Sequence, residues 1–401
     1  VVFFLLAAAP GFWLPVLSNV LKAKGWGGLT TWAFLIPHLA GIISPILLGA
    51  RADNKYRADR ILALTLGGGA IFLFLAFYHL EHGDHPGWFL FFLSLNALVS
   101  APAWSLLMTV ALANLEDRER QFGWIRVWGT IGWMLAGWSV SIWKLDASAL
   151  SGQVATAVRV CAGIACLFLP ATFPQGQGGG GWRSALGLGS LRLLRDRDMA
   201  TYFLTVFLFW IPLSAFYMHT PVFLNHLGWE RVAAGMTIGQ ISEVAAMLTL
   251  GVVLVRFRLR YVLLAAIGCG VARYALYALG ASTGVGSAVT FVFLGVALHG
   301  ICWTFFFESG RIFVDRRVDP GMRAQSQALL TLVSSGLGGV VGTLAVGGLY
   351  EWMVRSRPED PQWTAYWLVL TAMCLVCGLL FAAGYQGQAA VQPRARTSDE
   401  K

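Results

Sequence analysis

The segment VAAGMTIGQISEVAAMLTLGVVLV, from Val232 to Val255, sets the class of protein to which this chain belongs. It is long enough to cross a bilayer as a helix, which takes roughly 20 apolar residues. Gln240 and Glu243 nevertheless lie near its middle. A carboxylate at that depth is costly and is tolerated only against a protein interior or a water-filled path. Residues three apart share one helix face, so we expect the rest of the chain to enclose this polar face.

The composition of the whole chain agrees with a polytopic helical membrane protein. Of 401 residues, 57% are hydrophobic and only 12% are charged, whereas a soluble domain has about 25% charged residues. Twelve apolar spans are predicted, near residues 1–22, 31–50, 61–80, 88–113, 124–143, 154–172, 199–224, 232–255, 261–280, 287–310, 325–350 and 364–385. The sixth and seventh spans are separated by a glycine-rich, basic connection that contains QGQGGGGW. We therefore expect two bundles of six helices, at residues 1–172 and 199–385, with a cytoplasmic linker at 173–198 and a tail at 386–401.

The basic residues predict an orientation in the membrane. Twenty of the 29 Lys and Arg residues fall on the connections of one side and six on those of the other. Because basic residues are concentrated in cytoplasmic loops, both termini are expected to be cytoplasmic. This distribution also accounts for the net charge of +9 without a nucleic-acid partner. The chain begins at Val1, so a few preceding residues are expected to be missing, and residues 1–22 read as a first helix and not as a signal peptide.

The cysteines give no indication of a metal site. All six lie within apolar spans. Cys374 and Cys377 form a C-x-x-C pair, but no second pair or histidine cluster accompanies it. We interpret them as small buried residues and expect no metal and no cofactor.

Polar side chains in the fifth span form a second candidate surface. Arg126, Thr130 and Trp133 have the spacing i, i+4, i+7 and so lie along one helix stripe. A guanidinium, a hydroxyl and an indole together suit a hydroxylated, aromatic solute. The alternative is an arginine placed near the cytoplasmic interface at the start of a helix.

Glu243 is the candidate for proton coupling, because desolvation favours the neutral form of a carboxyl and lets it load and release a proton. The alternative is a structural ion pair with Arg273 of the ninth span. His219 and His299 remain weaker candidates, since lone histidines in apolar helices are usually satisfied core residues.

The end of the tenth span, HGICWTFFFESGRIFVD, adds further candidates. Trp303 and Phe307 are four residues apart and could offer a stacking surface for a ligand. Thr304 and Glu308 form a second pair at the same spacing. Glu308 is a possible second proton carrier, but Arg311 follows three residues later and could simply neutralise it.

Five segments carry a resemblance to a known family: FGWIRVWGTIGWMLAGW at 122–138, GQISEVAAMLTL at 239–250, ARYALYALG at 272–280, HGICWTFFFESGRIFVD at 299–315 and RAQSQALLTLVSSGLGGVVG at 323–342. With these segments, in this order, the chain resembles the bacterial nucleoside:proton symporters, a branch of the major facilitator superfamily. The resemblance implies two six-helix bundles in the inner membrane, alternating access around a central cavity, and uptake driven by the proton gradient. It also implies that Arg126, Thr130, Gln240 and Glu243 bind the nucleoside and couple its transport. One departure concerns the tenth helix, where the family has an aromatic residue followed by Asp and two Phe. This chain has Thr304 in place of that acid, and Glu308 could substitute for it one turn later.

The expected function is therefore proton-coupled nucleoside import by a monomeric carrier. Two alternatives stay open: a transporter of a sugar or another hydroxylated metabolite, and a membrane sensor that does not transport. An enzyme is not expected, because no constellation of nucleophile, histidine and acid converges at one membrane depth.

Overall fold

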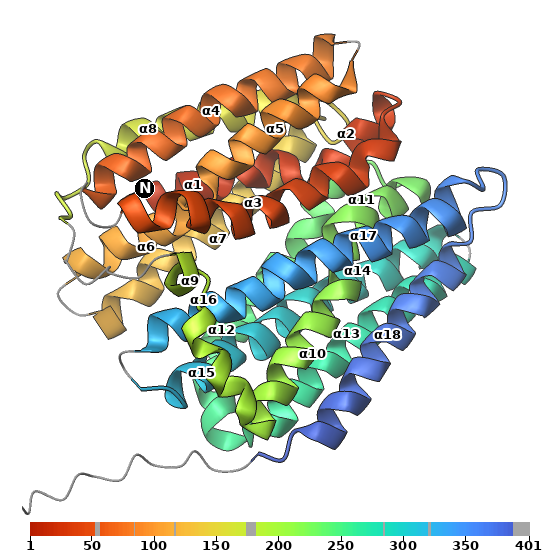
Figure 1. Ribbon diagram of the computed structural model, residues 1–401. Helices are drawn as coiled ribbons and strands as arrows, with labels where there is room; N and C mark the ends of the chain where they lie inside the picture. The colour runs from red at the N-terminus through yellow and green to blue at the C-terminus, as the bar shows by residue number, and fades with distance from the viewer. Residues whose placement is uncertain are drawn as a thin grey trace, which may run out of the picture.

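The computed structural model describes residues 1–52, 57–83, 85–115, 118–173, 182–283, 285–319 and 322–387. Every regular element within these ranges is a helix (Figure 1). The tail from residue 388 onward and part of the predicted linker, residues 174–181, lie outside the described residues, as do several of the loop charges counted above.

The first half of the chain supplies the predicted spans one to six. The spans consist of α1 (Val2–Trp13), η1 (Leu14–Val16) and α2 (Leu17–Ala23); η2 (Gly27–Leu29) and α3 (Thr30–Ala52); α4 (Ala58–His82); α5 (Pro86–Ser100) and α6 (Ala103–Asn114); α7 (Arg118–Ile142); and α8 (Leu150–Cys166). Figure 1 shows these helices gathered on one side of the molecule, with the helices of the second half on the other side.

The second half supplies spans seven to twelve, after the short elements α9 (Trp182–Ala185) and η3 (Leu188–Arg195). The spans consist of α10 (Arg197–Leu213) and α11 (Ala215–His226); α12 (Val232–Arg256); α13 (Leu259–Ser282); α14 (Val285–Trp303), η4 (Thr304–Glu308) and α15 (Ser309–Arg316); α16 (Arg323–Thr331), η6 (Leu332–Gly338), α17 (Gly339–Tyr350) and η7 (Glu351–Arg355); and α18 (Trp363–Gly384). Ten of the twelve predicted spans are helical segments long and apolar enough to cross a membrane. The other two are α7, which carries Arg126, and the shorter α8.

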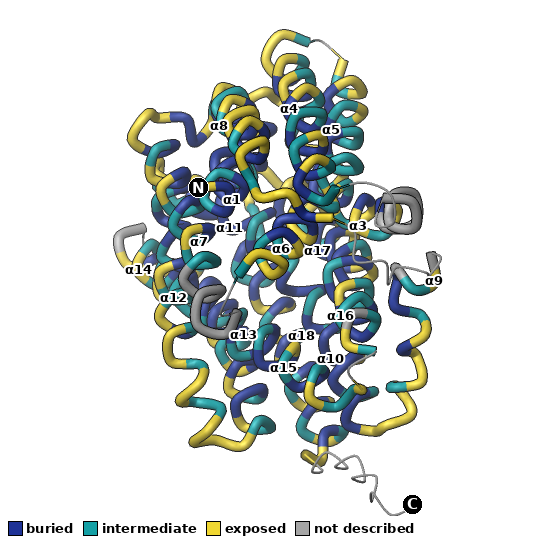
Figure 2. The backbone as a smooth tube through the Cα atoms, turned by 90° about the vertical axis from the view of Figure 1, so that its left-hand side faces the viewer, coloured by how far each residue is buried: buried dark blue, intermediate teal, exposed yellow. Residues whose placement is uncertain are grey.

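Large apolar side chains cover the outside of the molecule. Leu64, Leu248 and Val255 are 74%, 75% and 91% exposed, and Figure 2 shows exposed stretches along the outer helices with buried ones between them. An apolar surface of this extent is expected where lipid, not water, surrounds the protein. The all-helical architecture predicted from the sequence is confirmed for the described residues.

Several spans are broken where proline removes a backbone donor. In the seventh span, α10 ends next to Pro212 and α11 begins at Ala215. Near this break the Pro212 carbonyl accepts a hydrogen bond from the Tyr274 hydroxyl at 2.5 Å, and the Trp210 carbonyl accepts one from the Ser214 hydroxyl at 3.0 Å. Such side-chain donors make a broken helix tolerable at membrane depth.

The two halves meet through α7 with α12, α3 with α17, and α2 with α11. Asn19 of α2 donates to the Pro221 carbonyl of α11 at 3.4 Å. Trp138 of α7 donates from Nε1 to Thr237 of α12 at 2.8 Å. We call the end of the molecule where α2 meets α11 the outer end.

An aspartate in the loop after α7 joins the two halves at this outer end. The Asp146 carboxylate accepts hydrogen bonds from the backbone N–H of Ala233 at 2.7 Å and from the Ser141 hydroxyl at 2.9 Å. Ser141 in turn accepts from the N–H of Ala234 at 3.0 Å. A residue of one half therefore caps the first turn of α12 in the other half.

Candidate functional site

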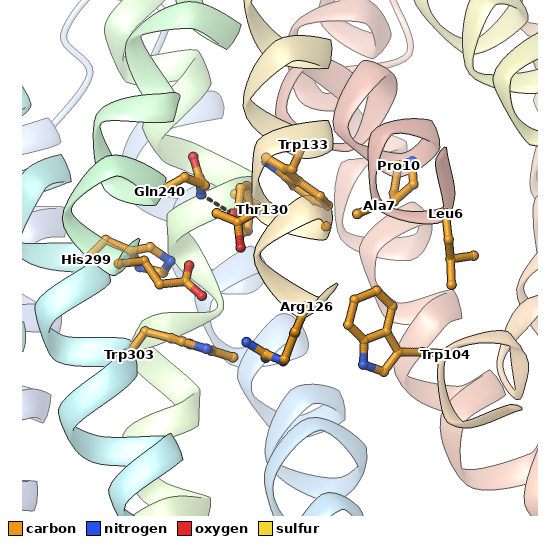
Figure 3. Close-up of a pocket in the computed structure, with 13 residues that line it drawn as sticks. Leu6, Ala7, Pro10, Trp104, Arg126, Thr130, Trp133, Gln240, His299 and Trp303 are labelled. Carbon is orange, nitrogen blue, oxygen red and sulfur yellow. Dashed lines mark hydrogen bonds between the residues drawn. The ribbon is translucent and has the colours of Figure 1, made fainter. Parts of the chain in front are cut away.

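A cavity of about 350 Å³ lies between the two halves of the molecule. The first half lines it through α1, α6 and α7, and the second through α11, α12 and α14. Its walls are mainly apolar or aromatic, with a few polar groups, which is the usual make-up of a small-molecule site. The lining residues are Leu6, Ala7, Pro10, Trp104, Arg126, Gly129, Thr130, Trp133, Tyr217, Gln240, Glu243, His299 and Trp303 (Figure 3).

The polar stripe of α7 faces this cavity. Arg126, Thr130 and Trp133 all line it, as their helical spacing predicts. The Arg126 guanidinium approaches the second half, with Nη2 at 3.6 Å from Glu308 Oε1 and Nη1 at 3.7 Å from the sulfur of Met247. Arg126 therefore forms both a wall of the cavity and an ion pair between the two halves.

The polar face of α12 lies on the other side. Gln240 donates from Nε2 to the Tyr217 hydroxyl at 3.0 Å, while its carbonyl oxygen is buried without a hydrogen-bond partner among the described residues. Glu243 lines the cavity and forms no ion pair within the described part of the chain. The cavity is therefore lined by a carboxyl that forms no salt bridge with a described residue and can accept hydrogen bonds from a ligand.

The alternative in which Glu243 pairs with Arg273 is wrong. Arg273 is fully buried in α13 and donates from Nη1 to Nδ1 of His299 at 2.9 Å. The helix spacing placed Arg273 at a suitable depth, but depth alone does not say which neighbouring helix a side chain faces.

The tenth-span candidates divide between the cavity and its surroundings. Trp303 lines the cavity, whereas Thr304 and Phe307 are not among the lining residues. Thr304 is completely buried and its hydroxyl has no partner among the described residues. Phe307 packs against Trp303, with ring centroids 4.6 Å apart, and therefore supports the indole from behind.

Glu308 also lies outside the lining, in the π-helical turn η4. Its Oε1 is 3.6 Å from Arg126 and 3.7 Å from Arg311. The ion pair with Arg311 expected from the i, i+3 spacing is present, and the contact with Arg126 reaches across the two halves. Only the fold could reveal this second partner, because the two residues lie far apart in the sequence.

A glycine in α14 brings the polar groups together. A Cβ atom added at Gly300 of α14 would overlap the backbone of Gly239 and Glu243 in α12. The absence of a side chain at Gly300 therefore lets α12 and α14 approach closely and places His299 beside the Gln240 and Glu243 face.

The remaining lining residues carry weaker signals in the sequence. Tyr217 and Trp104 lie in the proline-broken seventh and fourth spans. A break in a span changes the direction of the side chains that follow it. The prolines are therefore the signal in the sequence that these residues could face the cavity. Among the described residues, no group of three His, Cys, Asp or Glu side chains is arranged to hold a metal ion.

Comparison with known proteins agrees with this architecture. The family described as nucleoside H+ symporter matches residues 1–390. The putative nucleoside transporter YegT of Escherichia coli is 29% identical, over 92% of this chain and 89% of its own length. The nucleoside permease NupG of Escherichia coli is 27% identical, over 94% of this chain and 92% of its own.

Solved structures give the same picture. A crystal structure of the nucleoside transporter NupG superposes with a TM-score of 0.82 at 26% identity, covering 96% of this chain and 97% of that one. A crystal structure of a D-xylose-proton symporter shares the fold, with a TM-score of 0.70 at 13% identity, covering 97% of this chain and 98% of that one. With a family match over nearly its whole length and a cavity built between two six-helix halves, this chain belongs to the nucleoside H+ symporter family.

Proposed function

We propose that this protein imports nucleosides together with protons by alternating access. One observation carries the proposal: Arg126 and Thr130 from one half face the same cavity as Gln240 and Glu243 from the other, in a member of the nucleoside H+ symporter family. A ligand held by both halves couples its own binding to their relative movement.

The chemistry of the cavity suits the parts of a nucleoside. Trp133, Tyr217 and Trp303 offer aromatic faces for a base. The Glu243 carboxyl can accept hydrogen bonds from ribose hydroxyls, while Arg126 and Thr130 supply donors. In this proposal Glu243 takes up the coupling proton when the nucleoside loads and releases it to reset the carrier.

We further propose that residues 1–172 and 199–385 move as the two halves of the carrier in the bacterial inner membrane. With both termini cytoplasmic, the outer end faces the periplasm. The Asp146 cap and the Trp138–Thr237 hydrogen bond must then separate before a nucleoside can enter from outside. A monomer suffices for this cycle.

The test is uptake of radiolabelled uridine and adenosine in a transport-deficient cell at two external pH values. Wild-type protein should accumulate nucleoside more strongly at acidic external pH. Glu243→Gln keeps the shape of the side chain but cannot ionise, so it should lose pH-driven accumulation while still exchanging internal for external nucleoside. Undiminished accumulation by Glu243→Gln would remove the coupling role from Glu243.

A second candidate cargo is a sugar or another hydroxylated metabolite, and Thr304 in place of the family's acid is the observation that favours it. A thermal-shift panel of nucleosides and sugars on purified protein separates the two, because a ligand stabilises the state that it binds. If only sugars stabilise the protein, the cargo is a sugar and not a nucleoside. Binding without uptake would instead indicate a sensor.

A further inference from the structure

The buried Arg273 is a cation without a carboxylate partner. Its side chain is completely inaccessible, and no described Asp or Glu lies within 4 Å of it. The guanidinium lies over the rings of Tyr274 and Phe216, at 4.6 and 5.4 Å from their centroids. Its Nε and Nη2 atoms have no hydrogen-bond partner among the described residues. Because an unpaired buried charge is expensive, a residue of this kind at membrane depth indicates a functional constraint.

The hydrogen bond from Arg273 to His299 fixes the proton on the imidazole. A guanidinium has five N–H donors and no acceptor. The contact from Nη1 to His299 Nδ1, at 2.9 Å, therefore requires Nδ1 to be unprotonated and to accept. The ring is then neutral and carries its single N–H at Nε2.

Neighbouring rings fix the orientation of the same imidazole. Phe216 stacks on it with centroids 3.8 Å apart and an interplanar angle of 5°. Tyr217 and Trp303 lie 6.1 and 6.0 Å from it, centroid to centroid. A Cβ atom on Gly239 would be 3.4 Å from its Cδ2 atom, in van der Waals contact, so α12 passes close to that edge of the ring.

The Nε2–H donor remains available to a ligand. His299 lines the central cavity, and Figure 3 shows its ring extending from α14 toward the enclosed space. Nε2 has no hydrogen-bond partner among the described residues and is not among their buried unsatisfied atoms. By contrast, the side-chain amide nitrogen of Gln240 already donates one of its two N–H groups to Tyr217.

We propose that His299 is a specificity-determining residue that donates from Nε2 to an sp² acceptor of the nucleobase, and that Arg273 is the positioning residue that holds it in this tautomer. The partner is the base and not the ribose, because Trp303 and Tyr217 flank the ring and form the aromatic part of the cavity. This inference rests on the proposed nucleoside transport and identifies one feature that the cargo must carry.

The first experiment tests which acceptor atom of the nucleobase accepts the hydrogen bond from His299. Adenosine and its 1-, 3- and 7-deaza analogues, each with one ring nitrogen replaced by C–H, compete against labelled nucleoside, alongside uridine and 2- and 4-thiouridine. On wild-type protein at least one analogue should bind about tenfold more weakly than its parent, the effect of losing a hydrogen bond worth about 1.4 kcal/mol. In His299→Phe, which keeps an aromatic ring and removes the donor, that penalty should fall to about twofold or less. An equal penalty in both proteins overturns the inference, as does the absence of any penalty on wild type.

Arg273 variants and a control separate positioning from general stability. Arg273→Met should relax the discrimination as His299→Phe does, whereas Arg273→Lys, which still donates, should retain most of it. His219→Phe is the matched control, because His219 is also a buried histidine, bonds to Tyr366 and does not line this cavity. It should leave the discrimination unchanged. Relaxed discrimination in the control would show that any core histidine has this effect and would overturn the assignment.

A spectroscopic measurement tests the tautomer without any ligand. Nitrogen-15 NMR of histidine-labelled protein, assigned by the signal lost in His299→Phe, should show protonation at Nε2 and not at Nδ1. In Arg273→Met this tautomer should no longer be fixed. An Nδ1–H signal in wild type overturns the role of Arg273. Failure of wild-type protein to bind or transport any nucleoside would refute the proposed function instead, so the two failures are distinguishable.

Discussion

At the scale of single residues, the few charged side chains in and around the cavity differ in whether a partner of opposite charge lies beside them. Arg126 and Glu308 form a partly exposed pair across the two halves, with side chains 22% and 18% exposed. Glu243 forms no salt bridge in the described part of the chain, and Arg273 donates a hydrogen bond only to a neutral partner. A carrier that exchanges protons needs a carboxyl free to lose its charge, and Glu243 meets this requirement better than Glu308 does.

We predict that Glu308→Gln weakens nucleoside binding without abolishing proton coupling. Removing the carboxylate frees Arg126, and a partly exposed ion pair is worth about 1 kcal/mol, so KM should rise about fivefold. The pH-driven accumulation ratio should stay near the wild-type value. Initial uptake rates over a range of nucleoside concentrations, with accumulation measured in parallel, check both expectations.

Arg311→Gln is the matched control, since it removes the other neighbour of Glu308 and leaves the contact with Arg126 intact. Its KM should change less than twofold if the contact with Arg126 is what matters. Loss of accumulation in Glu308→Gln at an unchanged KM would assign the coupling proton to Glu308.

At the scale of elements, Asp146 in the loop after α7 binds the first turn of α12, and the protonation of its carboxyl can be measured. Asp146 is 8% exposed and lies outside the membrane-spanning helices. Burial raises the pKa of its carboxyl above the ordinary value, outweighing the hydrogen bonds from Ala233 and Ser141, which lower it. The closed outer end therefore binds this proton more tightly than an open or unfolded state does.

We predict that the contribution of Asp146 to stability decreases as pH rises. A carboxyl with a raised pKa gives its full contribution below the ordinary value of about 3.9, and that contribution is lost as pH rises through the raised value. Asp146→Asn cannot titrate, so the difference in unfolding midpoint, wild type minus variant, should shrink as pH rises above about 4. Thermal unfolding in detergent across this range measures it, and a difference that grows with pH would contradict the sign.

Some interruptions of the helices can be predicted from the sequence and others cannot. The break at Pro212 could be expected from the proline alone. The π-helical turns at Thr304–Glu308 and Leu332–Gly338 could not, because no residue type requires them. Such turns often occur near functional sites.

At the scale of the whole molecule, contacts at the outer end join the two halves, and the proposed alternating-access cycle must separate the halves there. Thr31 at the start of α3 lies against Gly347 of α17, and a Cβ atom on Gly347 would be 3.0 Å from the Thr31 Cβ. These positions belong to different halves and can be linked covalently without entering the cavity.

We predict that a disulfide between Thr31→Cys and Gly347→Cys blocks uptake by holding the outer end closed. Bridged cysteines have Cβ atoms about 3.5–4.5 Å apart, which a small backbone shift provides here. Uptake should fall more than tenfold on oxidation and return on reduction, with each single variant as the control. Uptake that persists in fully cross-linked protein would show that the two halves need not part at this end.

Much of the molecule follows from the sequence alone. Apolar runs interrupted by basic loops are sufficient to predict the twelve spans, because crossing a bilayer forces a helix of fixed minimum length. Helical spacing also placed Arg126, Thr130 and Trp133 on one stripe, and Gln240 and Glu243 on one face, and all five line the cavity. These are local properties, set by the 3.6-residue period of one helix and independent of its neighbours.

What the sequence could not supply is which helix each face meets. Three features depend on how the helices rotate and approach one another. Arg273 pairs with His299 and not with Glu243, Glu308 contacts Arg126, and Thr304 is buried outside the cavity. These choices are made by packing, at Gly300 against Gly239 for example, where the lack of a side chain brings two helices together. A carboxylate midway along α12 could be recognised from its neighbours in the chain, but the groups that surround it come from other helices, which only the folded molecule brings near.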